Sequence, residues 1–184
     1  MGLFDRFKKP EPAPPPPPSA KALLEAKLAP VYPRLARQIT AMTPAEWEVI
    51  YFLGEAEPDK SSWSSVFYIQ EVGGGRIVRS GEIPAIYNVP NAEYLDQWAR
   101  LNDILMELYR CFLEEGQKPW QQMSMTLEQS GRFNIQYLYD TIHDGDGGQL
   151  AREVLWAYQT FKYLPREGTG MRDLLERQLR GARN

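Results

Sequence analysis

The side chains in this sequence that are suited to chemistry are one histidine, one cysteine and several carboxylates. His143 can serve as a general base or a metal ligand, but a zinc site needs further histidine or cysteine ligands, and Cys111 belongs to a different predicted element. Cys111 stands between Tyr109 and Phe112 in a helical pattern, which predicts a buried, unreactive thiol. These two residues therefore predict neither a catalytic nor a metal site.

Paired carboxylates are a further candidate for acid–base chemistry. Glu46 and Glu48 are predicted on the polar side of one strand, and Glu128 on the polar side of another. They would approach each other if the two strands were neighbours. A solvated sheet face is the simpler interpretation, so a small acid–base hydrolase stays the less favoured alternative.

The segment from Asp144 to Gly148 superficially resembles a calcium-binding loop. The EF-hand pattern has a ligand at its fifth position and a glutamate at its twelfth, where this chain has Gly148 and Leu155. The sequence also contains no G-x-S-x-G, P-loop or G-x-G-x-x-G motif. We therefore predict that the chain is not an enzyme and uses no cofactor or metal.

The segment from Gly116 to Asp140 predicts a β-hairpin with one buried and one polar face. Apolar residues alternate with polar ones on both sides of the turn signal Ser130-Gly131. The apolar set is Met123, Met125, Leu127, Phe133, Ile135, Tyr137 and Tyr139, and the polar set is Ser124, Thr126, Glu128, Asn134 and Gln136. The polar set offers amides, hydroxyls and one carboxylate, which favours a binding surface over catalysis.

The other periodicities complete an α+β domain. They predict a helix from residue 20 that Pro30 and Pro33 interrupt, three strands within residues 46–79, and a long helix from Asn91 to Gly116. After the hairpin they predict helices at 150–164 and 171–183. We expect two layers, with a mainly antiparallel sheet in the order α-β-β-β-α-β-β-α-α and helices on one face. The predicted units are a leader (1–19), the α+β domain (20–165) and a basic C-terminal helix (166–184).

The leader contains a proline-rich stretch, residues 10–18, that predicts a stiff polyproline II spacer. Before it, Leu3, Phe4 and Phe7 offer at most weak membrane contact. No run of about 18 apolar residues predicts a membrane span, and the first residues do not resemble a secretory signal. With a single cysteine, these features predict a cytoplasmic protein.

Charge is distributed unevenly along the chain. Residues 40–146 carry 17 acidic and 7 basic side chains, whereas the flanking segments carry 7 acidic and 14 basic ones. An acidic central domain repels nucleic acid and attracts basic protein surfaces. Solubility alone also accounts for an acidic domain, so the charge permits a protein partner without requiring one.

Four sequence blocks together resemble the YezG-like immunity proteins. They are Thr43-Pro-Ala-Glu-Trp47; Glu82-Ile-Pro-Ala-Ile-Tyr-Asn-Val89; Gly116 to Trp120 continuing through Thr126 to Asn134 and Tyr139; and Arg152 with Trp156-Ala-Tyr158. The blocks cover about residues 35–165. The polyproline leader and the basic final helix depart from the family pattern.

The resemblance implies a bacterial antitoxin that neutralises a cognate secreted toxin, commonly a nuclease. A nuclease carries a basic groove, which an inhibitor can cover with acidic side chains. We predict that two acidic loops do this: Glu55, Glu57 and Asp59 form one, Asp140, Asp144 and Asp146 the other, and Trp63 adds buried area. The alternative surface is the polar sheet face around Glu46, Glu48, Glu128, Asn134 and Gln136. A cytoplasmic adaptor unrelated to toxins is the alternative function.

Overall fold

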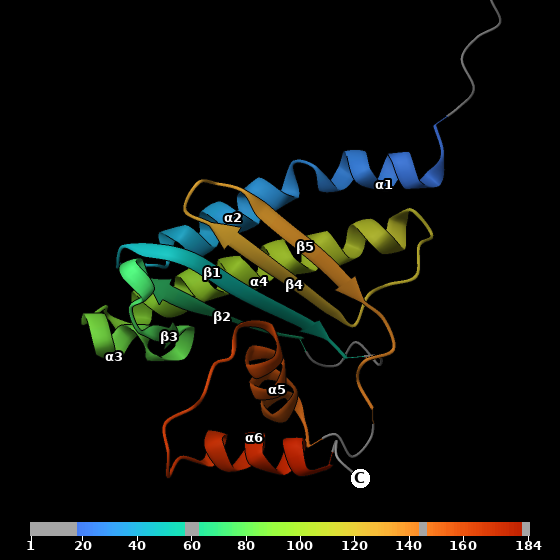
Figure 1. Cartoon of the computed structure of the whole chain (residues 1–184). Coiled ribbons are helices and arrows are strands. Elements are labelled where there is room, and N and C mark those ends of the chain that lie inside the picture. The colour runs from blue at the N-terminus through green and yellow to red at the C-terminus, as the bar shows by residue number, and fades with distance from the viewer. Residues whose placement is uncertain (1–17, 58–62, 144–146, 182–184) are drawn as a thin grey trace, which may run out of the picture.

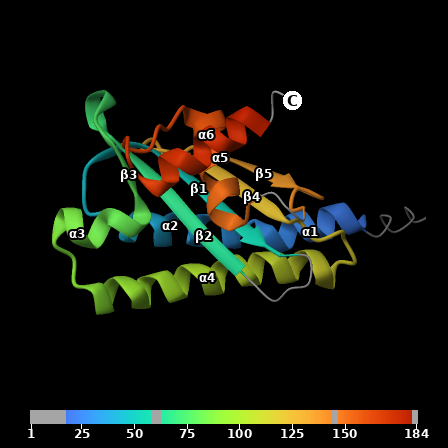
Figure 2. The same cartoon turned by 90° about the horizontal axis from the view of Figure 1, so that it is seen from below.

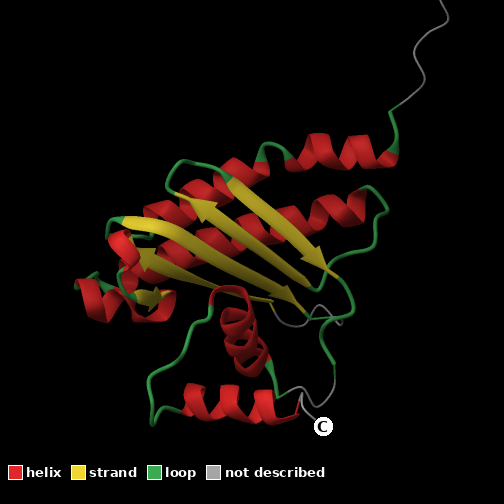
Figure 3. Cartoon of the chain, viewed as in Figure 1, coloured by secondary structure: helices red, strands yellow, loops and turns green. Residues whose placement is uncertain are grey.

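The domain is built on a five-stranded antiparallel sheet. A computed structural model describes residues 18–57, 63–143 and 147–181. The strands are β1 (Trp47–Ala56), β2 (Trp63–Glu71), β3 (Ile77–Arg79), β4 (Gln122–Glu128) and β5 (Phe133–Leu138). Their order across the sheet is β3-β2-β1-β4-β5 (Figures 1 and 3). The predicted hairpin is confirmed as β4–β5, in which Gly131 supplies the positive φ of the turn.

Helices α1 (Ala20–Leu28), α2 (Val31–Ala41) and α4 (Asn91–Glu114) cover one face of the sheet (Figure 2). Their apolar stripes bury Leu35, Ile39, Leu101 and Leu105 against it. On this face β1 contributes side chains such as Phe52, and Gly54 of β1 lets α4 approach closely. The α+β layering that the sequence predicted is confirmed for this side.

The opposite face carries α5 (Gln149–Phe161), which packs over β1 and β2, and α6 (Gly170–Gly181) outside α5 (Figure 2). The prediction that all helices lie on one face is therefore wrong. The alternating apolar residues Trp47, Val49, Tyr51 and Leu53 of β1 do not all share one side, because a bulge between Trp47 and Val49 changes the alternation. Trp47 then packs on the α2–α4 side, and Leu53 packs under α5.

Side-chain hydroxyls cap the N-termini of two helices, α1 and α6. The Ser19 hydroxyl accepts the Ala22 N–H at the start of α1, and the Thr169 hydroxyl accepts the Arg172 N–H at the start of α6. Gly116, at φ 62°, ends α4 as predicted. Asn91 is the first residue of α4, and Pro90 precedes it.

Short elements join β2 to α4. They are the 3₁₀ turns η1 (Val72–Gly74) and η2 (Ser80–Glu82) and the helix α3 (Ile83–Tyr87). Tyr94 on α4 donates to the Ser80 carbonyl at 2.8 Å, which fixes this corner to the core. Within the described residues, no helix has the length and the apolar character that crossing a membrane would require.

Candidate functional site

The two acidic loops predicted from the sequence begin or end at the same end of the sheet. The described residues there are Glu57 after β1, Trp63 at the start of β2, and Asp140 after β5. Asp59, Asp144 and Asp146 lie outside the described residues. Glu128 lies at the other end of β4, beside the hairpin turn, so the structure separates it from the rest. We call the group Glu55, Glu57, Trp63 and Asp140 the acidic end.

Gln121 joins the chain segments that lead into these loops. Its backbone carbonyl accepts the Ala56 N–H at 2.9 Å, and its side-chain Oε1 accepts the N–H groups of Thr141 and Ile142 at 2.6 and 2.9 Å. One residue therefore binds both the end of β1 and the segment after β5. Hydrogen bonds to backbone groups hold these segments in fixed positions beside each other.

Glu55 was predicted in an acidic loop, and this prediction is wrong. It is a residue of β1 and is only 3% exposed. Arg152 on α5 donates to it from Nε at 3.2 Å to Oε1 and from Nη2 at 3.0 Å to Oε2, and Gln122 donates to Oε1 at 2.6 Å. Glu57 lies 3.8 Å from the same guanidinium. Because the Glu55 carboxylate already accepts hydrogen bonds from Arg152 and Gln122, its role is to hold the acidic end in position and not to contact a partner.

A second buried ion pair binds Glu153, the residue of α5 that follows Arg152. Arg79 on β3 donates two hydrogen bonds to Glu153, at 2.6 and 2.8 Å, and Tyr68 on β2 donates a third at 2.6 Å. The bond to Glu153 raises the pKa of Arg79, and burial raises the pKa of Tyr68. Two adjacent residues of α5 are therefore fixed to three strands, which sets the position of the helix on the sheet.

Aromatic rings form the wall of the acidic end. Trp63, which is half-buried, meets Tyr109 edge-on at 4.6 Å between ring centroids, and Tyr109 meets Trp120 at 5.3 Å. Trp120 lies in the segment just before β4 and is only 1% exposed. The indole turns inward and also packs against Tyr137. A cavity of about 170 Å³ remains beside these rings, lined in part by Lys118 and Asp140.

Asp140 is not a free anion. Lys118 lies 2.5 Å from its carboxylate, and both side chains are mostly exposed. An exposed pair of this kind is held weakly, with a net contribution of about 0–1 kcal/mol. Asp140 can therefore exchange Lys118 for a cation on another protein at low cost.

The alternative surface, the polar side of the hairpin, is only partly covered. Helix α5 lies over β1 and β2, so Asn134 and Gln136 on β5 remain exposed. Glu128 is engaged by Arg132 at 2.7 Å, and this hydrogen bond lowers the pKa of the carboxyl. A lowered pKa is the opposite of what a general acid needs at neutral pH. Glu128 therefore does not support the hydrolase alternative.

The described residues also contain no group of three His, Cys, Asp or Glu side chains that is placed to hold a metal ion. Cys111 is buried, as predicted, and burial raises the pKa of its thiol, which disfavours the reactive thiolate. His143 is exposed. Sequence patterns did not predict the two arginine–glutamate pairs of α5; the only signal for them was the place of Arg152 in a family block.

The fold and the site define a small α+β binding protein. Residues 28–175 match the sequence model described as "Immunity protein YezG-like", so the chain belongs to the YezG-like immunity protein family. This membership makes it a binding protein of toxin–immunity systems and not an enzyme.

Three curated relatives span most of the chain. Immunity protein YezG of Bacillus spizizenii is 29% identical over 150 residues, which are 82% of this chain and 91% of the relative. The type VII secretion system protein EsaG of Staphylococcus aureus is 28% identical over 141 residues, 77% of this chain and 85% of the relative. Immunity protein YezG of Bacillus subtilis is 26% identical over 137 residues, 74% and 89% of the two chains.

Proposed function

We propose that this chain is a cytoplasmic immunity protein that neutralises a cognate secreted toxin, a nuclease, by covering its basic active-site surface with the acidic end. One observation carries the proposal. The segments leading into the two acid-rich loops, around residues 57 and 140, are tied side by side by Gln121 at one end of the sheet. Their carboxylates then act on the same side of the molecule.

The mechanism follows from electrostatics. A DNA-binding groove is lined with lysine and arginine because it must bind phosphates. Acidic side chains placed in that groove exclude DNA, and long-range attraction raises the rate of encounter with the toxin. Asp140, which holds Lys118 only by an exposed contact, can accept a cation of the toxin instead.

Rigidity at the acidic end supports the same role. The buried bonds of Glu55 with Arg152 and Gln122 fix β1, β4 and α5 relative to one another. A surface that is held in its binding geometry before contact loses less conformational entropy on association. Trp63 adds an aromatic ring beside the charges, a residue type enriched at the centres of interfaces.

The test is co-expression with the toxin candidate encoded beside this chain, scored by rescue of growth and by the rate of complex formation. The double variant Asp144→Lys with Asp146→Lys should slow association by about tenfold at low salt and flatten its salt dependence. The matched control reverses two exposed acids of α4, Asp96→Lys with Asp103→Lys, and makes the same change in net charge.

Slower association in the first variant and not in the control supports the proposal. Equal association rates in all three proteins, or equal slowing in both variants, would refute the acidic end as the contact surface. Reversal of Glu48 and Glu128 tests the alternative sheet face: if that variant alone slows association, the toxin binds there.

A further inference from the structure

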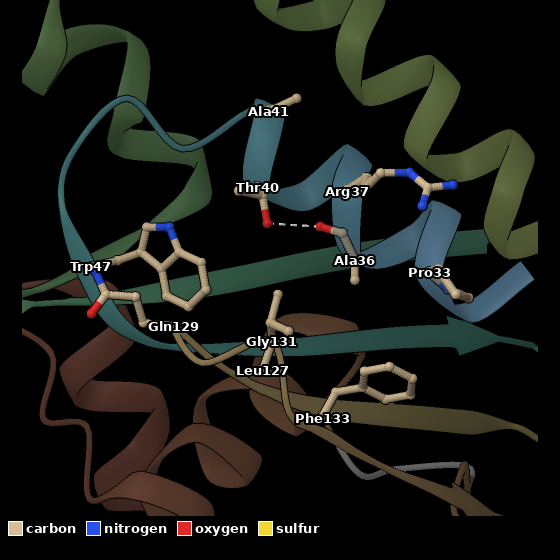
Figure 4. A pocket seen from close by; sticks show the side chains of 10 residues that line it. All are labelled: Pro33, Ala36, Arg37, Thr40, Ala41, Trp47, Leu127, Gln129, Gly131 and Phe133. Atoms are coloured by element: carbon tan, nitrogen blue, oxygen red, sulfur yellow. Dashed lines mark hydrogen bonds between the residues drawn. The ribbon is translucent and has the colours of Figure 1, made fainter.

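An apolar groove lies at the opposite end of the sheet from the acidic end. It has a volume of about 630 Å³ and runs between α2 and the β4–β5 turn (Figure 4). Its lining residues are Pro33, Ala36, Arg37, Thr40, Ala41, Trp47, Leu127, Gln129, Gly131 and Phe133. All of them lie within the part of the chain that matches the family.

The groove exists because α2 presents short side chains on the side that faces the turn. Val31, Leu35 and Ile39 point into the core, whereas Ala36 points toward the space between Trp47 and Phe133 (Figure 4). An alanine leaves this space open. Phe133 of β5 lies beside this space and is 40% exposed. Its ring also meets the ring of Tyr32 on α2 edge-on. Aromatic rings that stay open to solvent next to a groove are a common feature of protein contact sites.

On the α2 side of the groove the charge is opposite to that of the acidic end. Helix α2 contains two arginines and no acidic residue. Arg34 is paired with Glu107 on α4 at 2.7 Å. Among the residues that the structure describes, Arg37 has no ion-pair partner. Arg37 is one of the lining residues of the groove, and its guanidinium points away from Trp47 (Figure 4).

Polar groups on the opposite wall suit a peptide. Gln129, at the β4–β5 turn, uses its backbone N–H in a bond to the Glu48 carbonyl, and its side-chain amide is exposed. An amide both donates and accepts, as a peptide backbone does. A hydrocarbon ligand would leave this capacity unused.

We infer that this groove binds a peptide segment of a partner protein, with one aromatic side chain inserted against Ala36, Trp47 and Phe133 and a neighbouring carboxylate paired with Arg37. The occupant is thus acidic and aromatic, unlike the basic surface that the acidic end would contact. The inference does not depend on the proposed function, because the two surfaces lie at opposite ends of β1.

The probe is the capped peptide N-acetyl-Glu-Phe-Glu-amide, titrated into the full chain labelled with ¹⁵N. Two matched peptides replace both glutamates by glutamine, or the phenylalanine by glycine. The readout is the indole N–H signal of Trp47, assigned from the Trp47→Phe variant. We expect this signal to shift in the millimolar range with the first peptide, less with the glutamine peptide, and not with the glycine peptide.

Three variants and one control variant locate the binding. Arg37→Gln should lower the affinity for the glutamate peptide by about twofold to fivefold, as expected for an exposed ion pair. It should leave the affinity for the glutamine peptide unchanged. Arg34→Gln is the control, with the same charge change on the same helix. Ala36→Trp fills the groove and should abolish binding; Phe133→Ser, which removes one wall, should weaken it. Urea unfolding checks that each variant is folded.

Several results would overturn the inference. They are no shift of the Trp47 signal, equal affinity for the glutamate and glutamine peptides, or unchanged binding in Ala36→Trp. A concentration-dependent dimer that Ala36→Trp disrupts would show that a second copy of the chain occupies the groove instead, and would also refute it. Sedimentation of the unliganded protein and of the variant measures this directly.

Discussion

Arg152 and Glu55 are 97 residues apart in sequence and form a bidentate ion pair beneath the acidic end. The guanidinium comes from the first turns of α5 and the carboxylate from the middle strand of the sheet, and both side chains are less than a tenth exposed. The pair joins the layer that carries α5 to the strand that leads into the first acidic loop. It therefore connects the stability of the fold with the geometry of the proposed binding surface.

Breaking this pair from either side should be costly. Arg152→Ala leaves a buried carboxylate without its counter-ion, and Glu55→Ala leaves a buried guanidinium, so each should lower the free energy of unfolding by about 3–5 kcal/mol. Urea unfolding of the two single variants and the double variant measures the coupling. Arg132→Ala, which breaks the exposed pair with Glu128, is the control and should cost much less. A cost for Arg152→Ala no larger than this control would contradict the role given to the pair.

Gly54 lets α4 approach the sheet closely. A Cβ at this position would lie 2.8 Å from Cδ1 of Leu105, which is fully buried. Gly54→Ala should therefore destabilise the protein by about 1–3 kcal/mol through overpacking. Leu105→Ala removes the clashing atoms, so the double variant should be more stable than the sum of the two single losses predicts. Gly170→Ala, where the added Cβ meets nothing, should change little; additive losses in the double variant would show that the close contact does not matter.

Stability should fall at alkaline pH because of buried tyrosines. Burial raises the pKa of Tyr68 and of Tyr94. Above about pH 10 these phenols lose protons in the unfolded chain but keep them in the folded one. The unfolded state then binds fewer protons, so the free energy of unfolding decreases as pH rises. Urea unfolding across this range should give a smaller decrease for Tyr94→Phe than for the parent; identical slopes would show that Tyr94 does not contribute.

Glu71 should titrate at an unusually low pH because of Tyr87. The Tyr87 hydroxyl donates to Glu71 at 2.5 Å, and this bond, followed by the one from Arg76, lowers the pKa of the carboxyl. A lowered pKa stabilises the fold above the ordinary pKa of a glutamate, and this contribution is lost as pH falls. NMR titration should show that Tyr87→Phe raises the pKa of Glu71 toward its ordinary value, by more than Arg76→Gln does. A larger effect of Arg76→Gln would reverse the assigned order of causes.

Local patterns in the sequence predicted most of the elements. The alternation around Ser130-Gly131 predicted the β4–β5 hairpin, and Gly116 predicted the end of α4. Each of these signals depends on neighbours within a few residues, where backbone geometry and capping are decided. The four family blocks predicted the family, which the match over residues 28–175 confirms.

Other features could not be predicted from local patterns. The periodicity of β1 did not show that α5 would cover its second face, nor that the bulge after Trp47 would turn that ring to the other side. Glu55 looked like a loop anion, and no local pattern showed that Trp120 would be buried. Both are buried because segments far away in sequence, α5 and the aromatic cluster around Tyr109, pack over them.

The sequence by itself determined the period of each element, the turns, the uneven distribution of charge and the family. Only the tertiary structure decided which charges are used inside the protein and which face solvent. The reason is physical: a carboxylate is neutralised by whichever cation the fold brings within about 4 Å, and that distance depends on packing between elements, not on position along the chain. Tertiary packing thus pairs Glu55 with Arg152 and opens the groove beside Arg37 at the other end of the sheet.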